Sequence, residues 1–355
     1  MGIFRFFCPF LLLLSSSSFA VDTDNDGILS AGSRHNCVLD YTGVVCWGRN
    51  EYGQTDVPSL ISPKQVSSFG YHVCALDDTG VVCWGRNEYG QTDVPSLSNP
   101  SQVSSGDSHT CALDDSGVVC WGSNYWGVTD VPLLSNPTQV SSGDVHSCAL
   151  DDTGVVCWGH NFYGETDVPS LSNPTQVTSG RYFSCALDDT GVVCWGWNSA
   201  GQINVPSLTN PSQVSAGGGV SCALDDSGVV CWGWNGDGGT DVPSLSNPTQ
   251  VSVGYFHTCA IDDTGVVCWG RNEYGQTDVP ELTFTFDEDD TDADVTSTVL
   301  DIDANGSVDA LTDGLIILRY LFGLRGQSLI DGVISEDAMR AEAADIETYI
   351  ETLLP

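Results

Sequence analysis

Residues 74–95 read CALDDTGVVCWGRNEYGQTDVP, and residues 259–280 read CAIDDTGVVCWGRNEYGQTDVP, with a single difference between them. The same sequence motif occurs in seven copies, each 37 residues after the previous one. Each copy has a first cysteine, a second cysteine nine residues later and a tryptophan directly after the second. A fixed period of this length is typical of solenoids and propellers.

Each copy contains the pattern of a β-hairpin. In the third copy, the short apolar runs Thr110–Leu113 and Val118–Trp121 are separated by Asp-Asp-Ser-Gly, in which Gly117 is free to take a positive φ. The preceding Gln-Val-Ser-Ser predicts a third strand, and the stretch around Thr129 to Val131 could supply a fourth. No copy has a helical period. Three or four antiparallel strands in seven copies predict an all-β, seven-bladed β-propeller.

The repeat resembles that of a known family. Gly-x-x-His-x-Cys-Ala-Leu, then Gly-Val-Val, then Trp-Gly-x-Asn-x-x-Gly-Gln is similar to the regulator-of-chromosome-condensation repeat. The continuation Gly-Gln-Thr-Asp-Val-Pro resembles β-lactamase inhibitor protein II, a secreted relative. This resemblance covers residues 28–286 and implies a propeller that binds other proteins. The paired cysteines depart from both relatives, and the nucleotide-exchange activity of the nuclear relative is not carried over.

The first residues, 1–20, have the pattern of a secretory signal. Arg5 precedes a short apolar run, and Ser18-Phe19-Ala20 follows as a cleavage site. The apolar run is too short to cross a bilayer and no later segment could, so we expect a secreted protein without a membrane span. The formal charge is -37, with Lys64 as the only lysine. Nucleic acid and anionic lipid are therefore poor partners.

The cysteines of the mature chain predict one disulfide per repeat. A four-residue loop would place Cys74 directly opposite Cys83, which is within disulfide reach. Buried free thiols are the alternative, and zinc is disfavoured by the spacing. An export compartment and an even number of cysteines favour disulfides. The expected pairs are Cys37–Cys46, Cys74–Cys83, Cys111–Cys120, Cys148–Cys157, Cys185–Cys194, Cys222–Cys231 and Cys259–Cys268.

The copies differ from one another mainly in two windows. One lies four and three residues before the first cysteine, and the other lies two, four and five residues after the tryptophan. Hairpin geometry brings both to the end opposite the Asp-Asp-Thr-Gly turn, so one face of the disc should be variable and aromatic and the other acidic. Free drift of loop tips is the alternative. The residues expected to contact a protein partner are Arg49, Tyr71, Arg86, Tyr125, Trp126, His160, Phe162, Tyr163, Arg181, Tyr182, Trp197, Trp234, Tyr255, Phe256 and Arg271.

The histidines follow the repeat and are interpreted as structural. His35, His72, His109, His146 and His257 all lie two residues before a cysteine. No serine, histidine and acid form an isolated constellation, so we expect no enzyme.

The C-terminal segment changes character. Residues 287–299 form an acidic linker, and residues 300–355 contain a loop with EF-hand spacing followed by two amphipathic patterns. This module resembles dockerin, which implies calcium as a cofactor and a cohesin-like scaffold as a partner. The second loop has lost its ligands, and the first has threonine where an EF-hand has glutamate. The expected calcium ligands are Asp301, Asp303, Asn305, Ser307, Asp309 and Thr312 or Asp313.

A weaker calcium pattern lies in the acidic turn of residues 21–27, with Asp22, Asp24 and Asp26, where a plain surface turn is equally compatible. Taken together, these features predict an exported, non-enzymatic protein-binding module. Two alternatives stay open: a glycan-binding or scaffold-docked component of a polysaccharide-degrading system, and a structural surface protein.

Overall fold

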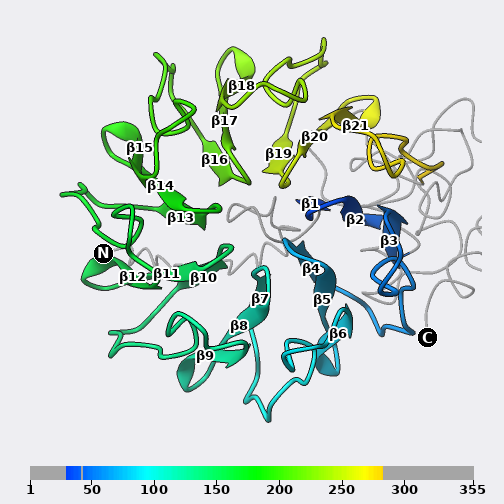
Figure 1. The fold of residues 1–355 in the computed structure, drawn as a ribbon, viewed down its shortest axis with the longest axis vertical. Coiled ribbons are helices and arrows are strands. Elements are labelled where there is room, and N and C mark those ends of the chain that lie inside the picture. Colours follow the sequence, from blue (N-terminus) through cyan, green and yellow to red (C-terminus); the bar gives the residue numbers. More distant parts are fainter. Residues whose placement is uncertain (1–28, 41–42, 283–355) are drawn as a thin grey trace, which may run out of the picture. The chain divides into compact units, whose positions relative to one another are not determined.

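The computed structural model describes residues 29–40 and 43–282. Twenty-one strands form seven three-stranded antiparallel sheets, arranged as blades around a central axis (Figure 1). The predicted all-β propeller with seven blades is confirmed. The signal segment, the acidic N-terminal turn, the acidic linker and the C-terminal module lie outside the described residues.

Each blade is built from an inner, a middle and an outer strand in chain order. The inner strands are β1 (Leu29–Ala31), β4 (Gln65–Ser68), β7 (Gln102–Ser105), β10 (Gln139–Ser142), β13 (Gln176–Ser179), β16 (Gln213–Ala216) and β19 (Gln250–Val253). The middle strands are β2 (His35–Asp40), β5 (His72–Asp77), β8 (His109–Asp114), β11 (His146–Asp151), β14 (Phe183–Asp188), β17 (Val220–Asp225) and β20 (His257–Asp262). The outer strands are β3 (Gly43–Gly48), β6 (Gly80–Gly85), β9 (Gly117–Gly122), β12 (Gly154–Gly159), β15 (Gly191–Gly196), β18 (Gly228–Gly233) and β21 (Gly265–Gly270).

The fourth strand considered for each blade is not present among the described residues. In the third blade, Asn124 holds the stretch in a turn, because its Oδ1 accepts from the Thr129 amide at 3.1 Å and its Nδ2 donates to Asp130 Oδ1 at 2.9 Å. Six of the seven repeats have the same Asn-to-Asp contact, and the fifth has Asn198 and Asn204. Side-chain turns therefore replace a strand ladder at this position.

The hairpin between the middle and outer strands has the predicted register. In the second blade, Cys74 faces Cys83 and Leu76 faces Val81. The strands extend further than expected, so the turn is shortened to residues 78–79. Asp77 accepts hydrogen bonds from the Thr79 amide and hydroxyl at 2.7 and 2.6 Å, and Gly80 has a φ of 121°. The Asp-Asp-Thr-Gly sequence is thus explained by local turn chemistry.

The hydrophobic core lies between blades. At the second junction, Cys74 and Leu76 of one blade are buried against Val103, Ala112 and Trp121 of the next. Burying such side chains contributes roughly 1.5–3 kcal/mol for each large one. Because the same cluster recurs around the ring, no blade has a core of its own, and adjacent blades stabilise one another.

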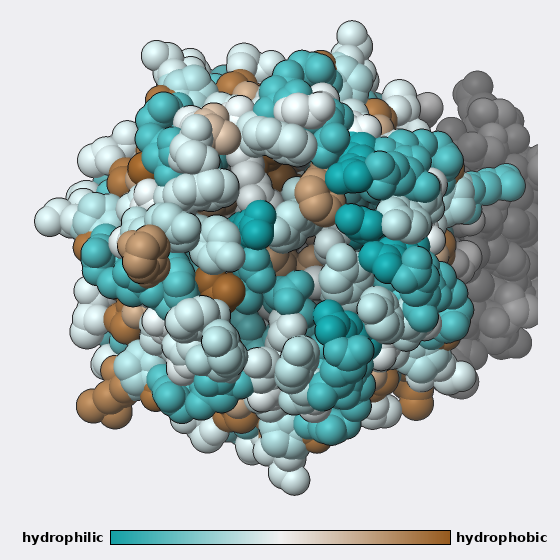
Figure 2. Space-filling model, viewed as in Figure 1, coloured by the Kyte–Doolittle hydropathy of each residue, from teal (hydrophilic) through white to brown (hydrophobic). Residues whose placement is uncertain are grey.

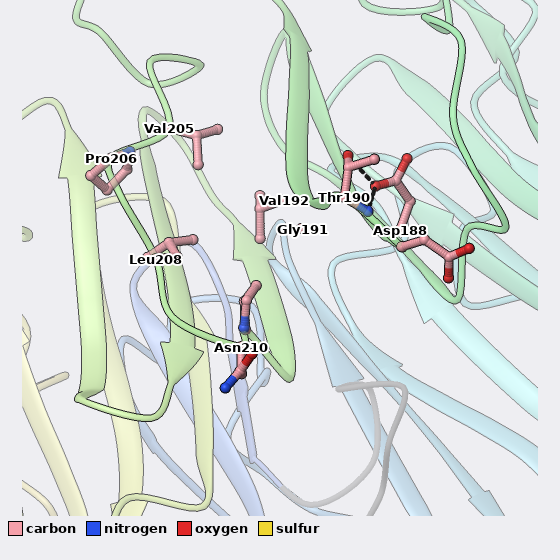
Figure 3. A pocket seen from close by; sticks show the side chains of 10 residues that line it. Asp188, Thr190, Gly191, Val192, Val205, Pro206, Leu208 and Asn210 are labelled. Atoms are coloured by element: carbon pink, nitrogen blue, oxygen red, sulfur yellow. Dashed lines mark hydrogen bonds between the residues drawn. The ribbon is translucent and has the colours of Figure 1, made fainter.

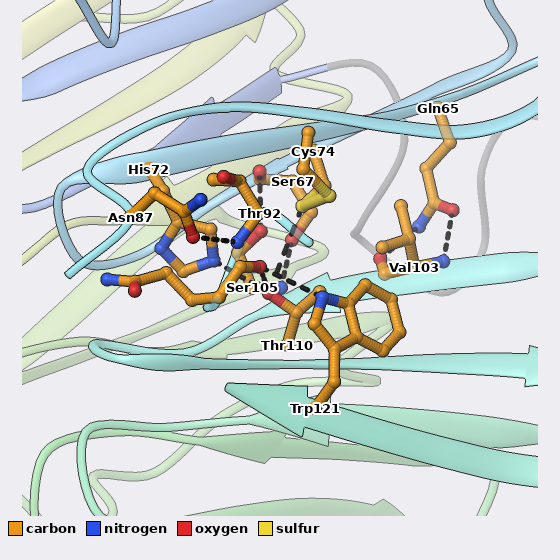
Figure 4. Close-up of a disulfide and its surroundings, with 12 residues drawn as sticks. Gln65, Ser67, His72, Cys74, Asn87, Thr92, Val103, Ser105, Thr110 and Trp121 are labelled. Carbon is orange, nitrogen blue, oxygen red and sulfur yellow. Dashed lines mark hydrogen bonds between the residues drawn. A yellow bond between two sulfur atoms is a disulfide. The ribbon is translucent and has the colours of Figure 1, made fainter. Parts of the chain in front are cut away.

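Side chains tie each inner strand to its neighbour (Figure 4). Ser67 Oγ accepts from the Ser105 amide at 2.9 Å, and Gln65 Oε1 accepts from the Val103 amide at 2.8 Å. At all seven junctions, a serine or threonine hydroxyl of one inner strand accepts a hydrogen bond from a backbone amide of the neighbouring inner strand. Edge amides that would otherwise be unpaired are therefore satisfied without mixing strands between blades.

The ring closes by the same contacts. Ser252 Oγ of the seventh blade accepts from the Ala31 amide at 3.0 Å, and the Tyr255 amide donates to the Gly32 carbonyl at 3.2 Å. The first and last blades each consist of consecutive strands, so closure needs no strand exchange.

Seven disulfides join the middle and outer strands of every blade, in the pairs that the sequence predicts. Cys74 Sγ also lies 3.9 Å from Thr110 Oγ1 of the next blade, beside His72 and the Trp121 ring (Figure 4). Each bridge therefore supports both its own hairpin and the junction between blades.

Candidate binding face

The two variable windows meet at one end of every hairpin. In the second blade, the Arg86 amide donates to the Tyr71 carbonyl at 3.0 Å, and the equivalent bond is present in all seven blades. Both windows lie at the strand ends away from the Asp-Asp turn. We call the surface made by these windows the variable face.

Aromatic side chains gather on the third to fifth blades. Ring centroids lie 4.7 Å apart for Tyr125 and Trp126, 4.6 Å for Trp126 and His160, and 5.8 Å for His160 and Tyr182. Tyr163 then connects Tyr182 at 5.3 Å with Trp197 at 6.0 Å. This continuous group, with Phe162, is called the aromatic sector.

The aromatic sector is unusually open. Tyr125 is 78% exposed and Phe162 is 79% exposed, while Trp126 and Tyr163 are 46% and 44% exposed. Tyr182 and Trp197 are half-buried beneath them. Contiguous exposed aromatic surface is costly in water and is typical of interaction sites.

His160 at the centre of the aromatic sector has a partner specific to its blade. Its Nδ1 contacts Glu165 Oε1, and Glu165 Oε2 accepts from the Tyr163 amide at 2.8 Å. Four other blades have a glutamine at the position equivalent to Glu165, namely Gln54, Gln91, Gln202 and Gln276. The histidine and the glutamate thus change together in the fourth copy, and their pairing holds the exposed loop in place.

Arginines stack on aromatic rings on the seventh, first and second blades. The guanidinium carbon lies 5.0 Å from the Tyr274 ring for Arg34 and 5.1 Å from the Tyr71 ring for Arg49. In each of these blades an arginine also pairs with the glutamate two residues later, as in Arg271 with Glu273 at 2.6 Å. Figure 2 shows hydrophilic surface gathered over these blades, at the right of the view. This group is called the arginine sector.

Four residues of the arginine sector are missing from the predicted contact residues: Arg34, Tyr52, Tyr89 and Tyr274. Arg34 also donates to the Tyr274 hydroxyl at 2.8 Å. Three of the four belong to Arg-Asn-Glu-Tyr, which is identical in three copies and so resembles scaffold. The signal that could have identified them is that these three copies are adjacent in the ring.

The remaining predicted contact residues occupy three environments. Trp234 is 41% exposed, alone on the sixth blade. Phe256 is half-buried between Arg34 and Arg271, whose guanidinium carbons lie 5.4 and 4.9 Å from its ring. Tyr255 and Arg181 stack on one another nearer the axis, at 5.1 Å. Phe256 and Tyr255 therefore also support the blades.

A partly buried carboxyl group, that of Asp144, lies near the axis of the variable face. Burial raises the pKa of Asp144 to about 7, and repulsion from Asp107 adds to the effect. Arg181 Nε lies 3.3 Å from Asp144 Oδ2 and lowers the pKa of this carboxyl, but the opposing effects of burial and of Asp107 are larger.

The repeat histidines are structural elements of the junctions. His109 Nε2 lies 2.8 Å from Ser147 Oγ of the next blade, and its burial lowers the pKa to about 4. Burial lowers the pKa of His72 to about 3 in the same way. These rings are neutral at physiological pH and are enclosed by the core.

The opposite end of the hairpins is acidic, but only part of its charge is exposed. The first aspartate of the turn, such as Asp77, accepts hydrogen bonds and is buried. The second, such as Asp152, is exposed and accepts from Asn136 Nδ2 at 2.6 Å. Hydrogen bonds lower the pKa of Asp77 despite the opposing effect of burial. The first aspartates thus support the fold.

The grooves beside these turns follow the repeat. Figure 3 shows one, with a volume of about 450 Å³, between the turn at Asp188 and Thr190 and the loop at Val205 to Asn210. Grooves at the same position follow the fourth and sixth blades. Their walls recur in the other copies, so they are products of the scaffold.

Other kinds of site are not found in the described part of the chain. Within residues 29–40 and 43–282, no group of three or more His, Cys, Asp and Glu side chains is arranged to hold a metal. The described residues contain no helix with the length and apolarity needed to cross a bilayer. The predicted calcium ligands lie outside the described residues.

The described blades define a seven-bladed propeller built from sequence repeats. The sequence pattern described as "Regulator of chromosome condensation (RCC1) repeat" matches residues 29–54, 64–91, 101–127, 138–165, 175–202 and 249–276. All six matched stretches lie in the propeller, so six of its seven copies carry the repeat pattern of that family. The unmatched sixth copy lacks both the histidine and the Gly-Gln of the repeat, having Val220 and Gly239 there, but it forms a blade like the others.

Solved structures share this fold. The ectodomain of the receptor kinase CR4 from Physcomitrella patens is 24% identical, with a TM-score of 0.60 over 69% of this chain and 73% of that chain. The CRINKLY WD40 ectodomain of the receptor kinase ACR4 from Arabidopsis thaliana is 24% identical, with a TM-score of 0.58 over 70% and 97%. Prp20p from Saccharomyces cerevisiae is 18% identical, with a TM-score of 0.57 over 70% and 83%.

No match is found among curated proteins. The resemblance to β-lactamase inhibitor protein II and to dockerin stays a prediction from the sequence.

Proposed function

We propose that this protein is an exported binding module whose variable face holds a protein partner. The observation that carries this proposal is the aromatic sector, which exposes Tyr125, Trp126, Phe162 and Tyr163 side by side on blades whose scaffold is otherwise nearly identical. Aromatic and arginine side chains are the usual anchors of protein interfaces.

Contrast between the windows and the scaffold supports this proposal. Residues needed for folding recur in every copy, as the tryptophan after the second cysteine does. Tyr125 and Phe162 do not recur, and they are more than three-quarters exposed, so packing within the blade does not explain them. A surface that binds a partner accounts for both their exposure and their restriction to single copies.

The disulfides and the similar structures support an extracellular location. The blades contain seven disulfides, and disulfides are typical of proteins in an oxidising compartment. Two of the similar structures are receptor-kinase ectodomains, and the study of Prp20p concerns its binding to Gsp1p and histones. Protein binding on this fold therefore has a parallel in Prp20p.

A comparison of three immobilised full-length chains tests the proposal against extracellular proteins and glycans. The first chain is wild type, the second carries Tyr125→Ala and Phe162→Ala, and the third carries Leu133→Ser. Leu133 is fully exposed but lies outside both windows, and most other copies have serine there. The Leu133→Ser chain therefore controls for the loss of a highly exposed apolar side chain outside the variable face.

We expect a protein that both wild type and the Leu133→Ser chain retain and that the aromatic double variant loses. Retention of the same proteins by all three chains contradicts the proposal. Loss of a glycan instead of a protein favours the alternative of a carbohydrate-binding component.

A further inference from the structure

A cavity of about 250 Å³ lies between the third and fourth blades. Tyr125 and Trp126 form its exposed wall together with Tyr89, and Asp107 and Asp144 supply two carboxyl groups. The two aspartates hold the same position in adjacent copies, four residues before the first cysteine. Serine, glycine, arginine or tyrosine holds it in the other copies. The cavity is therefore specific to this junction.

The lining of the cavity carries no arginine or lysine. Arg181 of the fifth blade approaches Asp144, but it is held between the rings of Tyr182 and Tyr255, at 5.0 and 5.1 Å. Asp107 accepts from the Ser108 hydroxyl at 2.8 Å. Arg181 therefore pairs with Asp144, and the charge of Asp107 is felt by Arg86 of the second blade, but neither guanidinium lines the cavity. The cavity itself combines two carboxyl groups with aromatic walls.

We propose that this cavity takes the lysine or arginine side chain of the partner bound by the variable face. A cation next to carboxylates gains charge-assisted hydrogen bonds, and one that also contacts tyrosine and tryptophan rings gains cation–π attraction. The volume lies below the roughly 300 Å³ of sites for drug-sized ligands and suits one side chain. This inference rests on the proposed function and names the chemistry that the partner presents.

Proton linkage follows from the same geometry. Asp144 faces Asp107 of the third blade, Arg181 of the fifth and Tyr255 of the seventh, and its pKa is raised to about 7. A bound cation favours the ionised carboxylate, so binding releases a proton. Affinity should therefore increase as the pH rises through about 7.

Four capped pentapeptides, each with a central residue flanked by glycines, test the proposal on the full-length protein. The central residue is lysine, arginine, norleucine or citrulline, so that each cation has an uncharged counterpart of similar shape. Binding is followed by tryptophan fluorescence and by calorimetry. We expect the lysine or arginine peptide to bind at least about tenfold tighter than its counterpart, with tighter binding at higher pH.

The Asp107→Asn and Asp144→Asn variants keep the shape of the cavity and remove its charge. We expect each to lose most of the preference for a cation, and Asp144→Asn to lose the pH dependence, while the exposed Asp152→Asn on the opposite side changes neither. Equal affinity of charged and uncharged peptides, no saturable binding, or an unchanged preference in both variants overturns the proposal.

The failure of this inference is separable from the failure of the proposed function. A partner whose binding depends on Phe162 and Tyr163 but not on Asp107 or Asp144 leaves the variable face intact as a binding site and removes the cation pocket. If the binding of the partner depends on none of these four residues, both the proposed function and the cation-binding cavity are excluded.

Discussion

At the scale of single residues, Asp144 is a partly buried carboxyl group on the variable face. Its folded-state pKa of about 7 lies above the ordinary value of 3.8, so the folded protein holds this proton more tightly than the unfolded chain. The resulting stabilisation is present at low pH and is lost as the pH rises from about 4 to about 7.

We therefore expect Asp144→Asn to raise the melting temperature near neutral pH. The gain should shrink at a pH near 4, where the folded wild type also carries a neutral side chain. Thermal melts of both proteins at the two pH values check this. A variant that melts lower than wild type near neutral pH would show that the ion pair with Arg181 is stronger than the geometry indicates.

The buried histidines predict the opposite dependence. Burial lowers the pKa of His109 from 6.5 to about 4, so the unfolded chain binds the proton more tightly. The stability contributed by the neutral ring is present above about 6.5 and is lost as the pH falls toward 4. Five such histidines together should make the propeller sensitive to acid in this range.

His109→Phe should reduce this sensitivity by one group. Phe183 fills the same position in the fifth blade and is fully buried, so the scaffold tolerates phenylalanine there. We expect a shallower dependence of melting temperature on pH between about 6.5 and 4. Equal slopes for the variant and wild type would mean that this histidine is not a source of the acid sensitivity.

At the scale of the blade, the disulfides close short hairpins. Each joins residues nine apart, so the loss of one bridge should cost about 2 kcal/mol. The double variant Cys74→Ala with Cys83→Ala, compared with wild type by chemical denaturation, measures this cost. A matched double variant at Cys222 and Cys231 tests whether the cost is the same in the divergent sixth blade.

Mass spectrometry of non-reduced peptides tests the pairing itself. We expect seven bridges within repeats in the exported protein. Bridges between repeats, or fourteen thiols open to alkylation, would contradict the pairing.

The C-terminal module provides a separate prediction. We expect residues 300–355 to bind one calcium ion through the loop that begins at Asp301, because its oxygen-bearing residues have EF-hand spacing. Calorimetry of the full chain against a variant with Asp301→Ala and Asp303→Ala checks this. Equal calcium heats for the two proteins would exclude the loop as the site.

At the scale of the molecule, the fold could be predicted because the repeat constrains it seven times. The two-residue turn sets the register of Cys74 and Cys83, and the register sets which side chains face the next blade. The fourth strand could not be excluded, because β-branched residues such as Thr129 suit a strand and only the reach of Asn124 forms the turn.

The candidate site could be predicted as a face but not as a set of contacts. Hairpin geometry brings the windows together in any blade, as the bond between Arg86 and Tyr71 shows. The division into an aromatic and an arginine sector, and the pairing of Asp144 with Arg181, depend on contacts between blades. Those contacts depend on the curvature of the ring, which no single repeat encodes.

The most direct test of the central claim is a titration with the partner captured by the wild-type chain. Binding and melting temperature are measured together for wild type, Trp126→Ala, Tyr163→Ala and Asp152→Ala. We expect the two aromatic variants to lose about 2 kcal/mol of affinity, roughly thirtyfold, at unchanged melting temperature, and Asp152→Ala to bind nearly as wild type does. Lowered melting temperatures with unchanged affinity would show that these rings serve the scaffold and that the variable face is not where the partner binds.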